Sequence, residues 1–371
     1  MYVAVKGGEK AIESAHELQN KKRRGPLATP ELSVKQIQYQ LSGSVDRVMT
    51  EGGIYDPELA ALSIKQASGD LVEAIFLLRA YRTTLPRFVT SKPLETNKMV
   101  IQRRISAIYK DIPGGQVLGP TYDYTHRLLD FSLLAEGSDN EEKTNKKEEN
   151  PSFSEEDNYS QVTSMLEEEN LLVMEKNTDC IASDLTMNPI SFPCDRSAKL
   201  QQLVRGDEGF LLGMGYSTQR GYGDNHPFVG EIRIGNVSVS VFSEELGFEI
   251  EVGEIEISEC QLINGFTGDK NQRAKLTRGY GLAYGHNERK TISIALVDRA
   301  LQSKEYNEAV ESPAQDEEFV LSHADNVEAS GFLSHLKLPH YVDFQADINL
   351  LRQMQKDFDN NQQSIERKSN D

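Results

Sequence analysis

Two histidines near the end of the chain have the type and spacing that metal coordination requires. His335 and His340 lie in the sequence SHLKLPHY, and Pro339 is expected to end a helix that begins near Asp325 or Asn326. Residues five apart on an unbroken helix point roughly 140° away from each other, but a turn at the proline removes that restriction. Two converging imidazoles are half of a zinc site. Taken alone, the spacing favours a simpler alternative, in which His335 binds the terminal carbonyls of the helix and His340 lies in a turn.

A second group of reactive side chains lies between residues 110 and 127. Glycine-rich turns at residues 111–115 and 119–120 are interleaved with charged and aromatic residues, among them Lys110, Asp111, Asp123, His126 and Arg127. Glycines let the backbone approach a ligand closely, and these side chains can supply charge and proton transfer. The alternative is a tight connection in which tyrosine and histidine pack beneath a loop. The sequence does not decide between the two.

Two further arginine-rich stretches could bind phosphates. Residues 266–289 are glycine-rich and begin with a basic half that contains Arg273 and Arg278; an exposed basic loop is the alternative that we prefer there. Arg79 and Arg82 are three apart on a predicted helix and therefore share a face. Such a face can bind phosphates, although pairing with nearby acids is the commoner outcome.

Charge and composition restrict the class of protein. The chain has 371 residues and a net charge of −18, which argues against a nucleic-acid binder. Much of the acid lies in residues 136–170, so the remaining surface is less acidic than the total suggests. No apolar run reaches membrane-spanning length, and the first residues lack the pattern of a secretory signal. The three cysteines are far apart, so we expect no disulfide framework or iron–sulfur cluster, and a cytoplasmic location.

Hydrophobic periodicity predicts an α+β fold with a helical N-terminal region, a central antiparallel sheet and C-terminal helices. Helices are expected over residues 9–24, 32–49, from 57 and from 71, and again over 196–205, 291–300 and 344–358. Residues 227–257 alternate with period two, which indicates paired strands. We divide the chain into a mainly helical region 1–135, an acidic and poorly ordered insertion 136–164, and a mixed region 165–365.

Six segments together resemble the I subunit of bacterial carbon–phosphorus lyase. They are MYVAVKGGEKAI, ELAALSIKQASGDLVEAIFLLRAYRTTLPR, RRISAIYKDIPGGQVLGPTYDYTHRLLDFSLL, QRGYGDNHPFVGEIR, TRGYGLAYGHNERK and SPAQDEEFVLSHADNVEASGFLSHLKLPHYVDF. The resemblance covers nearly the whole chain, and the acidic insertion after Ala135 is the clear departure from it.

The resemblance implies a role in phosphonate breakdown. The family's I subunit belongs to a core assembly with the G, H and J subunits, in two copies each. With G, H and L it makes alpha-D-ribose 1-methylphosphonate 5-triphosphate from MgATP and methylphosphonate and releases adenine; K is a further partner. Alone, it resembles a nucleosidase of purine nucleoside triphosphates. The two family histidines that bind zinc at the boundary with J match His335 and His340, which reverses the preference from spacing alone.

The chemistry of adenine displacement needs particular side chains. An acid must serve the departing base, a carboxylate must lie near C1 of a cation-like ribose, and cations or Mg²⁺ must support the triphosphate. From local composition, the expected catalytic residues are Asp111, Asp123 and His126, and the expected phosphate ligands are Lys110, Arg127, Arg273 and Arg278. Two other interpretations remain: a scaffold subunit that organises G, H and J, and a free-standing metalloenzyme.

Overall fold

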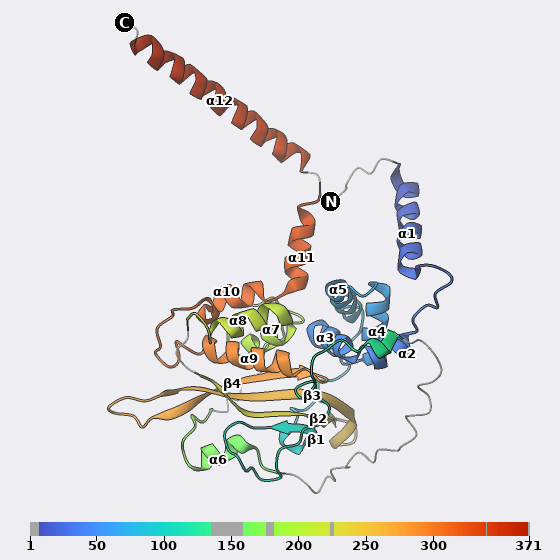
Figure 1. Cartoon of the computed structure of the whole chain (residues 1–371), viewed down its shortest axis with the longest axis vertical. Coiled ribbons are helices and arrows are strands. Elements are labelled where there is room, and N and C mark those ends of the chain that lie inside the picture. Colours follow the sequence, from blue (N-terminus) through green and yellow to red (C-terminus); the bar gives the residue numbers. More distant parts are fainter. Residues whose placement is uncertain (1–6, 135–158, 176–181, 223–225, 339, 370–371) are drawn as a thin grey trace. The chain divides into compact units, whose positions relative to one another are not determined.

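The computed structural model describes residues 7–134, 159–175, 182–222, 226–338 and 340–369 (Figure 1). The chain divides into two compact units: residues 28–327 form one, and residues 1–27 with 328–371 form the other. Most of the predicted acidic insertion, and the short strand expected at residues 2–5, lie outside the described residues. The described elements combine helices with one antiparallel sheet, so the α+β prediction is confirmed.

The larger unit begins with a group of four helices, α2 (Val34–Gln40), α3 (Ser42–Gly52), α4 (Pro57–Gln66) and α5 (Leu71–Arg82). Ser33, Asp56 and Asp70 cap three of them through side-chain acceptors. The prediction of one helix over residues 32–49 is wrong, because Leu41 leaves the helical dihedral region and separates α2 from α3. A core of valine, isoleucine, alanine, leucine and methionine joins these helices.

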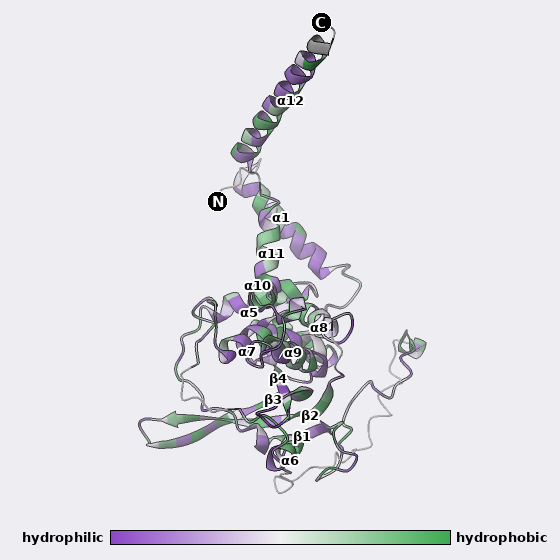
Figure 2. Ribbon diagram, turned by 90° about the vertical axis from the view of Figure 1, so that its left-hand side faces the viewer, coloured by the Kyte–Doolittle hydropathy of each residue, from purple (hydrophilic) through white to green (hydrophobic). Residues whose placement is uncertain are grey.

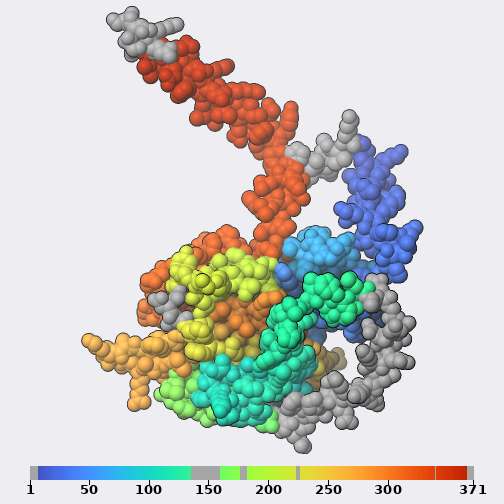
Figure 3. Space-filling model, viewed as in Figure 1, coloured from blue at the N-terminus to red at the C-terminus, as the bar shows by residue number. Residues whose placement is uncertain are grey.

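The sheet contains β1 (Val100–Ile105), β2 (Phe228–Ser243), β3 (Phe248–Thr267) and β4 (Lys275–Tyr284), in that order and antiparallel throughout. The alternating pattern predicted β2 and β3. The preferred interpretation of residues 266–289 as an exposed loop is wrong, because β4 lies within them and pairs with β3 from residue 257 to residue 267. The β3–β4 connection, orange at the left edge of Figure 3, projects from the surface.

The two faces of the sheet differ in chemistry. Helix α9 (Glu288–Leu301) packs on one face, where Gly279 and Gly281 of β4 lie against its backbone: a Cβ at either would lie 1.9–2.0 Å from a carbonyl oxygen of α9. The opposite face carries buried ion pairs. Arg104 donates to Glu231 across 2.6 Å, and Arg233 pairs with Glu259. Helix α6 (Val162–Glu168) contacts β2 and lies over this polar face, where Thr163 donates to Gln261.

Further helices complete the unit around α9. They are α7 (Arg196–Arg205), α8 (Glu208–Ser217) and α10 (Glu317–His323), with 3₁₀ turns η1 (Thr96–Lys98), η2 (Phe131–Leu134) and η4 (Pro313–Gln315) elsewhere. A leucine-, isoleucine- and valine-rich core joins α7, α8, α9 and α10. The predicted helix at 196–205 is confirmed as α7.

The smaller unit contains α1 (Gly8–Arg24), most of α11 (Asn326–His335) and α12 (Tyr341–Ser369). Helix α12 extends the predicted helix 344–358 at both ends. Its apolar residues recur at helical spacing, and Figure 2 shows apolar and polar residues alternating along it. The exposed members of this apolar stripe are Phe344, Leu351, Met354, Phe358 and Ile365. None of the described helices has the length and apolar content needed to cross a membrane.

Candidate functional site

The histidine pair forms a converging arrangement. Helix α11 ends at His335, and backbone turns that close at Leu336, Lys337 and Leu338 lead the chain towards His340. The two Nε2 atoms lie 2.8 Å apart, and the rings meet edge to face with centroids separated by 4.5 Å. These turns bring both imidazoles to one point, and Pro339, where a turn was expected, lies outside the described residues.

The chemistry of this pair fits two positions of a zinc shell. Neutral imidazole nitrogens are preferred zinc ligands, at about 2.0–2.1 Å from the metal. Among the described residues, no group of three or more histidine, cysteine, aspartate or glutamate side chains converges on one point. Two histidines leave two positions of a tetrahedral shell for ligands from outside this set.

Of the residues predicted around positions 110–127, some are fixed by hydrogen bonds and ion pairs and others are exposed. Arg103, which is 4% exposed, donates to the Asp123 carboxylate across 2.7 Å and to the Glu288 carboxylate across 2.5 Å. Its remaining Nη1 donates to the Leu118 carbonyl. The Arg127 guanidinium lies 3.9 Å from Asp123, and its Nε donates to the Tyr122 carbonyl. The structure thus brings Asp123 and Arg127 together.

The other members of that group are placed at the surface. Lys110, Asp111 and His126 are exposed, and their side chains make no hydrogen bond or ion pair with the described part of the chain. They lie in the loops that connect β1 to η2. Among the described residues, no hydrogen bond or ion pair joins their side chains to Asp123 or Arg127.

The two arginines of the 266–289 stretch have different surroundings. Arg273 is exposed in the β3–β4 connection. Arg278 lies on β4, where it donates to Glu167 across 2.9 Å, to Gln261 across 3.0 Å and to Glu175 across 3.4 Å. Two carboxylates therefore already neutralise Arg278, and a phosphate would have to compete with them.

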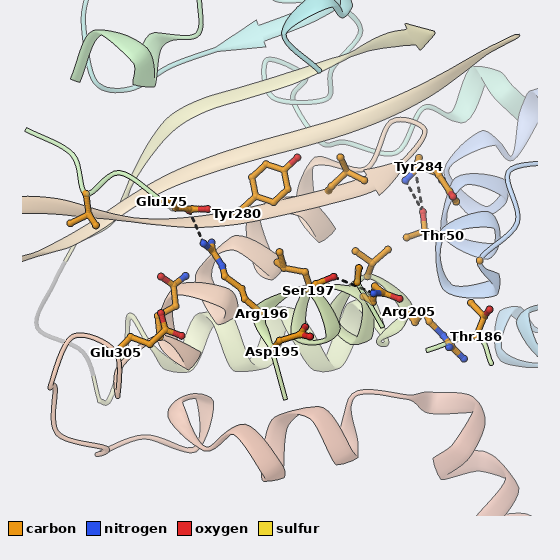
Figure 4. A pocket seen from close by; sticks show the side chains of 18 of the residues that line it. Thr50, Glu175, Thr186, Asp195, Arg196, Ser197, Arg205, Tyr280, Tyr284 and Glu305 are labelled. Carbon is orange, nitrogen blue, oxygen red and sulfur yellow. Dashed lines mark hydrogen bonds and ion pairs between the residues drawn. The ribbon is translucent and has the colours of Figure 1, made fainter. Parts of the chain in front are cut away.

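A cavity of about 1200 Å³ lies in the larger unit, beside β4. Figure 4 shows side chains that line it: Tyr280 and Tyr284 project from β4, and Arg196, Ser197 and Arg205 come from α7. The helical group contributes Thr50, Gly53 and Arg82. Arg278 reaches this cavity indirectly, because Glu175 bonds both Arg278 and Arg196, the latter across 2.7 Å.

The carboxylates next to Arg196 are tightly held. Asp298 is buried and accepts two hydrogen bonds from Arg196, at 2.7 and 3.2 Å, and one from the Tyr280 backbone N–H. Burial raises the pKa of Asp298 in spite of these bonds. Burial also opposes ionisation of Glu175, but its two arginine partners hold its pKa below the usual value. Ion pairs therefore hold the carboxylates of Asp298 and Glu175 in place, and these pairs stabilise the wall of the cavity.

Sequence comparison decides the family. The family model described as "Bacterial phosphonate metabolism protein (PhnI)" matches residues 1–358. The chain belongs to the PhnI family. It is 60% identical to the alpha-D-ribose 1-methylphosphonate 5-triphosphate synthase subunit PhnI of Escherichia coli (strain K12), over 96% of this chain and 99% of that protein. It is 53% identical to the protein of the same name from Rhizobium meliloti (strain 1021), over 97% and 96%, respectively.

A third relative widens the family. The putative C-P lyase subunit protein HtxH of Stutzerimonas stutzeri is 43% identical over 95% of this chain and 96% of its own length. The predicted resemblance is therefore confirmed, and so is a role as a subunit in phosphonate breakdown. As a PhnI family member, the chain is a subunit of a multisubunit carbon–phosphorus lyase system.

The cavity of this PhnI family member was not predicted as a site. Its residues come from at least six separate stretches of the sequence, so no local motif marks them. One signal was present, the Arg79–Arg82 pair on α5. The structure separates the two: Arg79 donates to Asp325 across 2.6 Å and to the Glu51 and Arg205 carbonyls, whereas Arg82 lines the cavity.

Proposed function

We propose that this chain, with partner subunits, displaces adenine from MgATP by methylphosphonate and so forms alpha-D-ribose 1-methylphosphonate 5-triphosphate. The observation that supports this proposal is the 60% identity to a subunit named for that synthase, over 99% of its length. In this reaction a phosphonate oxygen bonds to C1 of the ribose, and the bond from C1 to the base nitrogen breaks. The proton that adenine gains comes from a general acid.

The residues proposed for catalysis are Asp111, Asp123 and His126. Of these, Asp123 is held most firmly, because the buried Arg103 fixes its carboxylate. A fixed carboxylate can stabilise the cation-like ribose, and His126 at the surface can act as the acid. Lys110, Arg127, Arg273 and Arg278 are the proposed phosphate ligands, with Mg²⁺ entering bound to ATP.

The chain alone is proposed to act as a nucleosidase that splits ATP or GTP into base and ribose 5-triphosphate. Purified chain incubated with MgATP in the cytoplasmic pH range should release adenine, which chromatography measures directly. With the partner subunits and methylphosphonate, the ribosyl product should change from the free sugar triphosphate to its phosphonate ester. A preparation free of other enzymes that released no adenine under either condition would contradict the proposal.

His335 and His340 are proposed to bind zinc. The 2.8 Å approach of their Nε2 atoms supports this assignment. Water, a bound ligand or the J subunit would complete the coordination. Bound there, zinc would act as a Lewis acid or as a structural link between subunits.

A second candidate function is that of a scaffold for the G, H and J subunits. The core assembly would contain two copies of each core subunit, and the L and K subunits would associate with it. The apolar stripe of α12 favours it, because side chains such as Phe344 and Phe358 are 64% and 61% exposed. Variants at Asp123 and Arg127 separate the two candidates. If the chain is an enzyme, these variants lose adenine release while size-exclusion chromatography shows unchanged assembly. If it is a scaffold, they lose adenine release and assembly together.

A further inference from the structure

The cavity beside β4 has a wall built from alternate residues of one strand. Tyr280, Leu282 and Tyr284 all line it, as side chains two apart on a strand must share a face. Helix α7 provides the facing wall, with Leu200 and Val204 among its apolar residues. Apolar and aromatic walls with a few charged groups are typical of a binding site for an organic ligand.

One end of this cavity is cationic. Arg82 lies over Gly53, since a Cβ at Gly53 would lie 2.9 Å from the Arg82 Nη1 atom. The Arg82 guanidinium makes no ion pair or hydrogen bond with any residue that the structure describes. Burial, followed by the like charges of Arg79 and Arg87, lowers its pKa, although Asp184 acts in the opposite direction. An anion bound here would relieve that repulsion.

The same end contains further groups suited to phosphate oxygens. In Figure 4, Thr50, Thr186, Arg205 and Tyr284 lie together at one end of the cavity. Guanidinium groups bind phosphate through paired hydrogen bonds, which are stronger than neutral ones. The Asp184 carboxylate also contacts this end, because it accepts from the Thr186 backbone N–H across 2.9 Å, and Arg87 neutralises it across 2.6 Å.

The other end is aromatic and carries two carboxylates, of which Glu175 is paired with Arg196 across 2.7 Å. Figure 4 places Glu175, Tyr280 and Glu305 there. Tyr306 also lines the cavity, and its hydroxyl donates to Gln302. Carboxylates repel phosphates, whereas they accept hydrogen bonds from amines and hydroxyls. Tyrosine rings provide a surface on which a planar base can stack. The cavity is therefore polarised along its length.

We propose that this cavity binds a purine nucleoside triphosphate, with the phosphates at the Arg82 end and the base at the Tyr280 end. This assignment rests on the proposed function and adds to it a second nucleotide site, separate from the proposed catalytic residues and from the phosphate ligands proposed with them. Arg82 is a binding residue in this assignment. None of the described residues pairs with its charge, whereas Arg79 is paired with Asp325.

The test measures equilibrium binding by calorimetry with the full chain and three probes: MgATP, inorganic tripolyphosphate and adenosine. Arg82→Gln should weaken binding of MgATP and tripolyphosphate by about tenfold or more, and leave adenosine binding unchanged. The affinity of Arg82→Lys for MgATP and tripolyphosphate should lie between that of the wild type and that of Arg82→Gln. The matched control is Arg220→Gln, because Arg220 is an exposed arginine outside the cavity lining; it should change binding by less than about twofold.

A second pair of variants keeps the test independent of folding at Arg82. Thr186→Glu introduces a negative charge at the phosphate end and should weaken binding of both phosphate probes. Met187→Glu adds the same charge at the next residue, which is 74% exposed and outside the cavity lining, and should have no effect. Equal binding by both members of either pair, or no binding of the phosphate probes by the wild-type chain, would overturn the assignment. Adenine release by the assembled subunits reports separately on the proposed function.

Discussion

The imidazoles of His335 and His340 approach more closely than neutral side chains without a shared partner usually do. At 2.8 Å, two nitrogen lone pairs repel unless a proton or a metal ion lies between them. A shared proton explains the distance as a hydrogen bond. Two nitrogen ligands of one tetrahedral zinc lie about 3.4 Å apart, so zinc binding requires the two rings to separate slightly. The two explanations predict different effects on zinc content when one histidine is replaced.

If the pair binds zinc, His335→Ala and His340→Ala should each lower zinc affinity by about 100-fold or more, because either leaves a single protein ligand. Metal content after dialysis, measured by mass spectrometry, checks this. His323→Ala is the matched control: its Nδ1 contacts the Phe319 carbonyl at 2.7 Å within α10, and its loss should leave the zinc content unchanged. Equal zinc content in all three variants would leave only the hydrogen bond.

A second residue-scale effect concerns Asp46. Burial raises the pKa of its carboxyl from 3.8 to about 6, with a smaller increase from Glu256 and a decrease from the hydrogen bond of the His286 N–H. The folded state therefore holds a proton that the unfolded state has released between pH 4 and pH 6. Stability contributed by this group is highest at low pH and falls as pH rises through about 6, by about 3 kcal/mol in all.

Replacing Asp46 with asparagine removes this titration and keeps an acceptor for His286. We expect Asp46→Asn to raise the unfolding midpoint at pH 8 relative to the wild type and to have little effect at pH 4.5. Thermal unfolding of both proteins at the two pH values checks the prediction. A difference between them that did not change with pH would show that the carboxyl ionises freely in the folded protein.

At the scale of elements, β4 depends on glycines. A Cβ on Gly281 would lie 2.0 Å from the Thr291 carbonyl oxygen, so α9 could not keep its distance from the strand. Gly281→Ala should therefore destabilise the protein by about 3 kcal/mol. Gly213→Ala, inside α8 with open space around its Cβ position, is the control and should be neutral or slightly stabilising. Denaturant unfolding of the two variants gives the comparison.

The same glycines explain which elements the sequence could predict. Strands β2 and β3 alternate apolar and polar residues, so period-two patterning located them. Strand β4 has glycine where an inward-facing strand usually has a large apolar residue, because α9 packs directly on its backbone; the pattern therefore suggested a loop. Helix α9 was predicted from its apolar spacing, but nothing local indicated that it needs a glycine surface beneath it.

The two candidate sites also differ in how far local sequence could predict them. The histidine pair is local, and the proline between its members made convergence possible, although spacing alone favoured the simpler alternative and only the family resemblance reversed that preference. The cavity joins α3, α5, α7 and β4, which only the tertiary fold brings together. Whether an arginine is paired also depends on the fold. Arg79 and Arg82 look equivalent on one helical face, yet within the described part of the chain Arg79 pairs with a carboxylate and Arg82 does not.

At the scale of the whole molecule, α12 carries an apolar stripe that no described residue buries. Leu351 is 56% exposed and lies near the centre of this stripe, whereas Gln353 lies on the opposite face of the helix. A subunit that packed on the stripe would bury Leu351 and gain about 1.5–3 kcal/mol from that side chain. The helix would then act as an attachment element in either the enzyme or the scaffold role.

Leu351→Asp should therefore weaken association with co-expressed partner subunits by at least about tenfold, since it removes apolar burial and places a charge in the interface. Gln353→Asp should associate as the wild type does. Because Leu351 is exposed in the chain alone, neither change should alter the thermal unfolding midpoint of the isolated chain or its adenine release. Co-purification and sedimentation measure the association. Loss of adenine release by isolated Leu351→Asp protein would mean that the stripe supports the chain's own active conformation and is not an attachment surface.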